Sequence, residues 1–400
     1  MYKSLNICDF TPKEEIETRL EGLRKRLIAE GVSFAVILQN VDLFYFTGTI
    51  QKGVLIVPAD QPPLFFVERS LYRAGMESPL EIIPIKKDKD IGNILSGKNI
   101  IKGRGGMELD VLPVTLFERW KSILSHDNMV DVSPSIKDVR LIKSKFEIAQ
   151  LIQSGKMISH VFQKAKDIIK EGMREIDIDA ALVGEMRRMN HQGFLRMRGF
   201  NQEMMCGYVT HGYSATISSN ADVPISGLGL GPAIGQGASV NVVKKGTPVI
   251  VDFGGGYNGY ITDETRAYAV GELKDIFLKG YQVAREIVEE TMSFAREGID
   301  ATEIFAKALD RAKKAGLEQY FMGYGEGQVS FVGHGLGLEI NELPVITPRH
   351  KKILKEGMVF AFEPKFIIPN EGAVGIEVDF IVRKDGLQRV TDSPLDIIYV

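Results

Sequence analysis

The chain has 400 residues, a formal net charge of −3 and 44% hydrophobic residues, which is typical of a globular protein with two or three domains. The small net charge gives no sign of a nucleic-acid or acidic-membrane partner, and no apolar stretch is long enough for a membrane span or a signal sequence. The two cysteines, Cys8 and Cys206, are too few for a disulfide framework. They predict free thiols and a cytoplasmic location.

The first 135 residues predict a small α/β domain. Thr11 is predicted to be a helix N-cap, with Pro12 at the first helical position and Glu14 as the capping-box glutamate, so a helix is expected from here to about Gly31. Three apolar strands are expected after it, at 34–38, 54–57 and 63–67. We expect no chemistry in this part, and we place the domains at residues 1–135 and 136–400.

In the second domain, a pair of helices followed by a pair of acidic strands is predicted twice. Ser144 and Glu147 form a capping box that opens a helix through about Ile169. The other helices are predicted at 176–189, 273–296 and 302–314. The repeated order suggests an internal duplication with the site between its halves, while residues 190–248 form a long segment without a predicted element.

The strand pair at 249–265 predicts a hairpin with two carboxylates on one face. An Asn-Gly turn at 258–259 fixes the register and places Gly254 opposite Asp263, with Asp252 on the same face. Two buried carboxylates would repel each other, and a divalent cation removes that cost. We expect Gly254 to leave the space beside Asp263 empty. The alternative is a surface hairpin with two solvated acids.

A second group of polar residues follows apolar strands later in the chain. Glu363 and Glu377 lie on the two arms of a predicted hairpin over 358–382. His334 stands between two glycines after a short apolar strand, at 331–337. A lone histidine is commonly structural, but four strand-borne carboxylates elsewhere favour a metal-ligand role for this one.

The order Asp252, Asp263, His334, Glu363 and Glu377 resembles the metal signature of the pita-bread metallopeptidases, the family of prolidase, aminopeptidase P and creatinase. The motifs around these residues and the spacings of 11, 29 and 14 positions match the prolidase-like branch. The resemblance implies an α+β fold: a C-terminal pita-bread domain, with a smaller N-terminal α/β domain of the creatinase type. It also implies a homodimer.

The resemblance further implies two divalent metal ions. Asp252 would bind one ion, His334 and Glu363 the other, and Asp263 and Glu377 would bridge them. An oxygen-rich set with one imidazole suits manganese or cobalt, with iron and zinc as alternatives. A metal-bridging hydroxide would be the nucleophile, and Glu363 would be the catalytic proton shuttle.

The sequence departs from the family at two substrate-site histidines, which are Gly235 and Asn341 here. His211 is a candidate catalytic replacement, and the Asn341 amide could donate a hydrogen bond to substrate. Arg196 and Arg198 are candidates for binding a substrate carboxylate. For each of these residues, the alternative is a surface or structural polar role.

Two smaller features concern the metal site itself. The family's Glu-Pro-Gly is Glu-Pro-Lys at 363–365, and Thr265 is either a hydrogen-bond donor that orients Asp263 or an ordinary strand threonine.

The resemblance predicts a metallopeptidase, an Xaa-Pro aminopeptidase or dipeptidase with a small peptide substrate. The missing histidines favour an alternative, a creatinase-like hydrolase or lyase acting on a non-peptide C–N or C–X bond of a small amine or carboxylate. A second alternative is a non-catalytic binding protein on the same fold, against which the complete ligand set argues.

Overall fold

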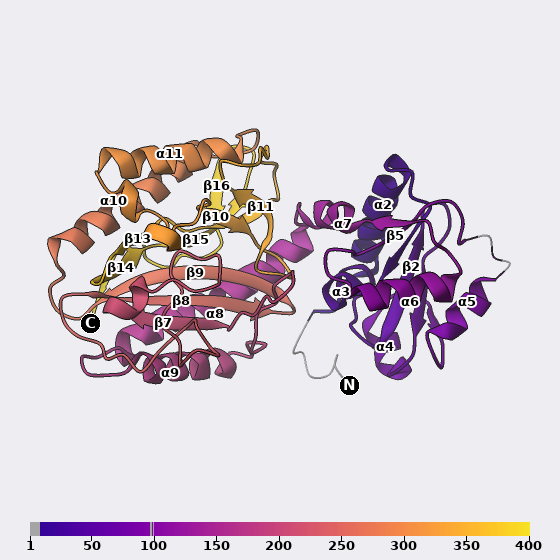
Figure 1. Ribbon diagram of the computed structural model, residues 1–400, viewed down its shortest axis with the longest axis horizontal. Coiled ribbons are helices and arrows are strands. Elements are labelled where there is room, and N and C mark those ends of the chain that lie inside the picture. The colour runs from indigo at the N-terminus through magenta and orange to yellow at the C-terminus, as the bar shows by residue number, and fades with distance from the viewer. Residues whose placement is uncertain (1–8, 97, 99) are drawn as a thin grey trace. The chain divides into compact units, whose positions relative to one another are not determined.

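A computed structural model describes residues 9–96, 98 and 100–400 of the chain (Figure 1). The chain divides into two compact units, one through Arg140 together with Gly199–Asn201, the other comprising Leu141–Arg198 and Gln202–Val400. The boundary expected at residue 135 falls inside helix α7 (Ser133–Arg140). This helix stays with the first unit because it packs on α2 (Lys13–Ala29).

The first unit is built on a six-stranded sheet of order β4-β3-β2-β1-β5-β6, with parallel and antiparallel pairs. Its strands are β1 (Phe34–Ile37), β2 (Gly53–Pro58), β3 (Leu64–Val67), β4 (Ile82–Pro84), β5 (Gly105–Met107) and β6 (Met129–Asp131). The remaining helices are α3 (Asn40–Thr47), α4 (Leu71–Glu77), α5 (Lys89–Leu95) and α6 (Val114–Leu124). The three predicted strands are β1, β2 and β3. The predicted cap was wrong, because Pro12 is the N-cap of α2 and no side chain caps it.

One layer of the second unit is a sheet of order β17-β9-β8-β7, with two helices along one face (Figure 1). Its elements are α8 (Lys145–Ile168), α9 (Glu175–Arg188), β7 (Gly207–His211), β8 (Pro248–Tyr257), β9 (Tyr260–Ala269) and β17 (Ile398–Tyr399). Val249, Val251 and Phe253 of β8 pack in one apolar cluster with residues of α8 and α9. Since side chains alternate along a strand, Asp252 and Gly254 face away from these helices.

A second layer is a sheet of order β11-β10-β12-β15-β16. Its strands are β10 (Gly333–Gly335), β11 (Glu342–Ile346), β12 (Val359–Phe362), β15 (Val378–Val382) and β16 (Leu387–Arg389). Beside it lies the pair β13 (Lys365–Ile368) and β14 (Gly372–Gly375). The helices are α10 (Asp275–Phe294) and α11 (Ala301–Lys314), and the short 3₁₀ turns are η1 (Gly212–Thr216), η2 (Glu318–Tyr320) and η3 (Gly325–Gly327).

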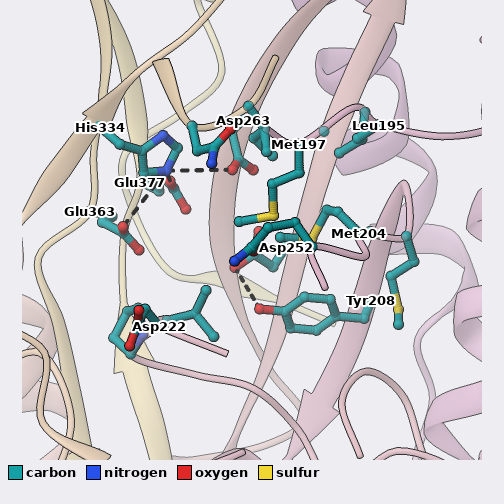
Figure 2. A pocket seen from close by; sticks show the side chains of 18 of the residues that line it. Leu195, Met197, Met204, Tyr208, Asp222, Asp252, Asp263, His334, Glu363 and Glu377 are labelled. Carbon is teal, nitrogen blue, oxygen red and sulfur yellow. Dashed lines mark hydrogen bonds and ion pairs between the residues drawn. The ribbon is translucent and has the colours of Figure 1, made fainter. Parts of the chain in front are cut away.

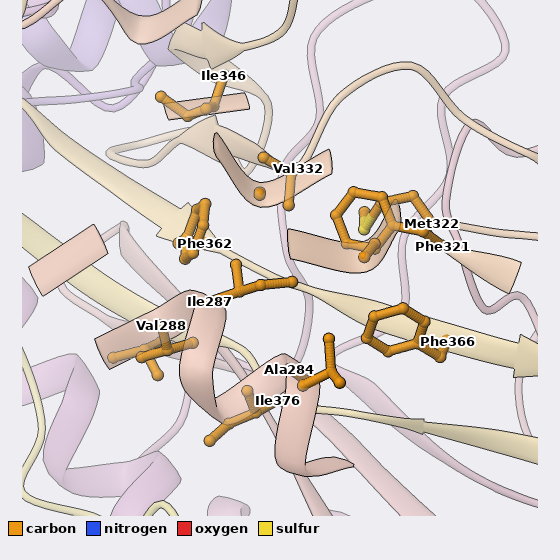
Figure 3. Packing of buried hydrophobic residues seen from close by; sticks show 14 of the residues in the cluster. Ala284, Ile287, Val288, Phe321, Met322, Val332, Ile346, Phe362, Phe366 and Ile376 are labelled. Atoms are coloured by element: carbon orange, nitrogen blue, oxygen red, sulfur yellow. The ribbon is translucent and has the colours of Figure 1, made fainter. Parts of the chain in front are cut away.

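A large buried cluster lies between α10 and the strands of the second layer (Figure 3). Ala284 and Ile287 of α10 pack with Phe362 at the end of β12 and Phe366 in β13. The core thus fixes the strand ends from which Glu363 and Lys365 project.

The predicted order of helix pair and acidic strand pair occurs twice, first as α8, α9, β8 and β9, then as α10, α11 and the strands from β12 to β15. The segment at 190–248 is not without regular structure, because it contains β7 and η1. None of the helices in the described residues is long and apolar enough to cross a membrane. Cys206 is a buried free thiol, and Cys8 lies outside the described residues.

Candidate metal centre

The β8–β9 hairpin confirms the predicted register around Asp252 and Asp263. Asn258 and Gly259 both have positive φ, as the tight turn requires, and Gly254 pairs with Asp263. The space beside Gly254 is not empty, because a Cβ there would lie 2.4 Å from Cδ1 of Leu195. The glycine therefore admits the Leu195 side chain rather than leaving a gap.

The glycines around His334 let three strands approach closely. A Cβ on Gly333 would lie 2.3 Å from the carbonyl oxygen of Ala361, and one on Gly335 would lie 2.1 Å from that of Leu343. Any larger residue at either position would separate β10 from β12 or β11. The predicted glycine cradle thus holds the His334 backbone against its neighbours.

The strands that carry Glu363 and Glu377 differ from the single hairpin predicted over 358–382. β12 pairs with β15 and β13 pairs with β14, but the ladder is interrupted between the two pairs. Pro364 lies in this gap and has no N–H to donate to a ladder. The register is the same on both sides, so Glu363 and Glu377 occupy opposite positions across the gap.

His334 and three carboxylates face one point (Figure 2). Nε2 of His334 lies 3.8 Å from Oδ2 of Asp263, 3.8 Å from Oε1 of Glu363 and 3.9 Å from Oε1 of Glu377. These separations are too long for hydrogen bonds. They suit ligands that share one cation at about 2.0–2.2 Å from each. Donor atoms of Asp263, His334 and Glu377 all lie within 4.8 Å of one another.

The electrostatics of the carboxylates also favour a cation. Burial raises the pKa of Asp263 well above its usual value, and the nearby Glu377 and Asp252 raise it further. Burial likewise raises the pKa of Glu377, although Lys365 opposes this shift. A divalent ion among these side chains would relieve the repulsion that disfavours their charged forms.

Lys365 lies among the same carboxylates. Its side chain is 3% exposed, and Nζ lies 3.1 Å from Oδ2 of Asp252, 2.9 Å from Oε2 of Glu363 and 2.7 Å from Oε2 of Glu377. Burial lowers the pKa of the Lys365 ammonium, but the three carboxylates outweigh this effect and hold the pKa well above its usual value. The residues present fit one divalent ion at His334; beside Asp252 they hold an ammonium group.

Two further contacts orient the ligands. Thr265 Oγ1 donates to Oε2 of Glu377 at 2.8 Å, so this threonine orients Glu377, which neither of the two alternatives for this residue included. The phenol of Tyr208 donates to the carbonyl oxygen of Ile225 at 2.7 Å and lies 3.5 Å from Oδ2 of Asp252 (Figure 2). Burial, and then the Asp252 charge, raise the pKa of Tyr208 well above its usual value.

A cavity of about 260 Å³ opens on the ligands. Its apolar wall includes Leu195, Met197, Met204, Met205, Val223, Pro224, Phe331, Ile340 and Val345. Its polar lining includes Tyr208, Gln202, Asn220 and Asp222, none of which was predicted. No sequence signal indicated them, because β7 and the loops around it lie in the segment without predicted elements.

The structure brings only one of the three predicted substrate residues to the cavity. Asn341 lines it, but its Oδ1 accepts from the Arg198 N–H and its Nδ2 donates to the Arg198 carbonyl, both at 2.8 Å. Arg198 lies 3.7 Å from Glu339, and Arg196 lies over the Phe194 ring at 5.2 Å. Neither arginine lines the cavity, so their environment does not agree with the predicted carboxylate-binding role.

His211 does not line the cavity either. Its Nδ1 is 3.1 Å from the carbonyl oxygen of Pro248, while Nε2 accepts from the Lys244 N–H at 3.0 Å and lies 3.0 Å from Oγ1 of Thr247. Burial lowers its pKa, which favours the neutral ring. Both ring nitrogens hold local backbone together, and this structural environment does not agree with the predicted catalytic role. Gly235 is exposed, also outside the cavity lining.

An α+β unit of two helix-covered layers, with strand-borne carboxylates and one histidine around a single cavity, defines a metallopeptidase of the pita-bread fold. The model of metallopeptidase family M24 matches residues 149–384, more than half of the chain, and that of the creatinase/prolidase N-terminal domain matches residues 19–142. The chain belongs to metallopeptidase family M24.

Relatives are similar over nearly the whole length. The chain is 26% identical over 385 residues to an Xaa-Pro dipeptidase of Pyrococcus furiosus, covering 96% of this chain and 100% of that protein. The structure of an Xaa-Pro dipeptidase from Bacillus anthracis superposes with a TM-score of 0.82 at 25% identity, covering 96% of this chain and 100% of that one. A prolidase structure from Pyrococcus furiosus gives a TM-score of 0.77 at 26% identity, with coverage of 93% and 99%.

Proposed function

We propose that this protein is a metal-dependent Xaa-Pro peptidase that cleaves Xaa-Pro dipeptides or removes an N-terminal residue preceding proline. The observation that carries the proposal is the convergence of Asp263, His334, Glu363 and Glu377 at one end of a partly apolar cavity. The full-length similarity to proteins named Xaa-Pro dipeptidase supports the same substrate class.

In this proposal, Asp263, His334, Glu363 and Glu377 hold a divalent ion, manganese or cobalt. When bound there, such an ion supplies an activated water and polarises the scissile carbonyl. Glu363 would accept a proton from the attacking water and pass it to the leaving amine. The cavity wall of Leu195, methionine and valine side chains accommodates the apolar proline ring.

The finer properties follow from composition and family resemblance. We propose a cytoplasmic homodimer that acts on small peptides, without a nucleic-acid or membrane partner. The small net charge of −3 supports the absence of a nucleic-acid or membrane partner. The low number of cysteines, two, supports a reducing compartment such as the cytoplasm. The family resemblance supports the homodimer.

The test is hydrolysis of an Xaa-Pro dipeptide and an Xaa-Pro tripeptide by manganese-loaded, cobalt-loaded and chelator-stripped protein. We expect metal-dependent cleavage of at least one Xaa-Pro peptide and much slower cleavage of the matched Xaa-Ala peptides. Asp263→Ala is the inactive control, because it removes a carboxylate that faces His334. A fully active Asp263→Ala protein with unchanged metal content would overturn the ligand assignment.

One observation favours a second candidate, a hydrolase or lyase acting on a non-peptide C–N or C–X bond of a small amine or carboxylate. Among the described residues that line the cavity, His334 is the only histidine, and the Asn341 amide is bonded to the Arg198 backbone. The site thus offers no second imidazole to a tetrahedral intermediate. Metal-loaded protein that leaves all Xaa-Pro peptides intact but converts a small amine would select this candidate.

A further inference from the structure

Lys365 has a position in the centre that the strand geometry dictates. The Lys365 carbonyl oxygen accepts a hydrogen bond from the Met322 N–H at 2.8 Å, and Lys365 is paired with Gly375 in the β13–β14 ladder. A Cβ on Gly375 would lie 2.7 Å from both Cα and Cγ of Lys365. The absence of a side chain at Gly375 therefore leaves the space that the aliphatic part of the Lys365 side chain occupies on its way to the carboxylates.

The two glutamates divide their oxygens between two cation positions. Oε2 of Glu363 and Oε2 of Glu377 both contact Nζ of Lys365, at 2.9 and 2.7 Å. Their Oε1 atoms instead face Nε2 of His334, at 3.8 and 3.9 Å. Each glutamate thus bridges two positive positions. One of these is filled by a covalently attached ammonium group.

The partners of Asp252 and Asp263 follow the same division. Oδ2 of Asp252 lies on the ammonium side, 3.1 Å from Nζ, whereas Oδ2 of Asp263 faces His334. A metal ion on the Asp252 side would need the same carboxylate oxygens at about 2.0–2.2 Å. It would therefore lie against Nζ, where two positive charges repel strongly in a buried site.

We propose that the Lys365 ammonium takes the place of one of the two metal ions expected for this family, so that each chain binds a single divalent ion at Asp263, His334, Glu363 and Glu377. The ammonium and one divalent ion together compensate three of the four carboxylate charges. The inference rests on the proposed function only in assuming that a metal is bound. It assigns Lys365 as a positioning residue that holds Asp252, Glu363 and Glu377 where a second ion would otherwise hold them.

The test counts metal ions in the full-length protein after equilibration with excess manganese or cobalt and removal of the free metal. Native mass spectrometry and elemental analysis give the number per chain, and electron paramagnetic resonance of the manganese form distinguishes isolated from exchange-coupled ions. The variants are Lys365→Gly, which restores the family residue, and Lys365→Met, which keeps the stem without the charge. Lys143→Met is the matched control, because Lys143 is an equally buried lysine 3.0 Å from Glu342.

We expect one isolated ion in the unaltered protein and in Lys143→Met. In Lys365→Gly we expect a second, coupled ion, bound at least about tenfold more tightly than any second ion in the unaltered protein. Two ions or none in the unaltered protein, or a single ion in both Lys365 variants, would overturn the inference. The number of ions bound by the unaltered protein tests the inference even if the variants do not fold. Any number other than one per chain would overturn it. None of these readouts uses a peptide, so a one-ion protein without Xaa-Pro activity would refute the proposed function alone.

Discussion

Thr265 Oγ1 donates a 2.8 Å hydrogen bond to the same Oε2 of Glu377 that contacts Lys365, so one carboxylate oxygen has two donors while the other faces His334. This contact leaves Oε1 of Glu377 as the oxygen available to a metal ion. The orientation of the ligand is therefore set before any metal arrives.

Thr265→Val should lower metal affinity by about 10- to 100-fold, because it removes the donor that orients Glu377 while keeping the shape of the side chain. Isothermal titration of chelator-stripped protein with manganese measures the change. Thr262→Val is the control, since the buried Thr262 hydroxyl is bonded to a hydroxyl outside the proposed ligand set, Ser154 Oγ, at 2.7 Å. Equal losses in both variants would indicate general destabilisation.

His211→Phe should leave kcat/KM per folded molecule unchanged, because the ring lies outside the cavity and both its nitrogens are engaged with local groups. The variant should lose roughly 1–3 kcal/mol in the free energy of unfolding, since the Lys244 N–H is left without its acceptor. Urea unfolding and peptide hydrolysis measure the two quantities. A large fall in kcat with unchanged stability would restore the catalytic role predicted from the sequence.

Arg266→Met should cost about 3–5 kcal/mol of unfolding free energy, because it leaves the buried Glu264 carboxylate without its cation. Arg266 is fully buried and also donates to the Glu377 carbonyl oxygen at 2.6 Å, so metal affinity should fall with stability. In the double variant with Glu264→Gln, the stability loss should be smaller than in Arg266→Met alone. Additive losses would show that the two side chains are not coupled.

Asp179→Asn should make the protein more stable at pH 8 and have no effect near pH 3. Burial raises the pKa of Asp179 to about 7 in the folded chain, against about 3.9 when unfolded. The folded state therefore holds the extra proton between these values, and stability falls as the pH rises through this window. Asparagine at position 179 does not ionise, so the variant avoids this loss of unfolding free energy, which is about 1–3 kcal/mol above pH 7.

Thermal unfolding at several pH values provides the measurement for Asp179→Asn. Asp177→Asn is the control on the same helix, because the exposed Asp177 has its pKa lowered by Arg174. That substitution should not stabilise the protein at high pH. A pH-independent difference between Asp179→Asn and the unaltered protein would show that burial does not perturb this carboxyl group.

The parts of the fold that short-range rules govern could be predicted from the sequence. The capping box at Ser144 starts α8, and the Asn-Gly turn sets the register that pairs Gly254 with Asp263. Both depend on residues a few positions apart. The order of ligands then indicated the second hairpin through resemblance to a known family.

The roles of Thr265, His211 and Lys365 depend on contacts between distant segments, and the sequence does not specify these in the same way. Residues two apart on a strand share a face, so Lys365 could have been placed beside Glu363 by that rule. What the rule could not supply was the interrupted ladder at Pro364 and the room left by Gly375. The partners of His211, at Pro248 and Lys244, come from a segment without predicted elements.

The strand register is the same on both sides of the gap at Pro364. The length of the turn between β13 and β14 therefore determines which residues face each other in the metal centre. One residue added to or removed from the turn at 369–371 would shift β14 by one position against β13. Since strand side chains alternate, the shift would bring a side chain opposite Lys365 in place of Gly375 and turn Glu377 to the far face. Loop lengths vary readily in proteins, but here natural or engineered variation in one short turn would be expressed as loss of both the ammonium path and a metal ligand.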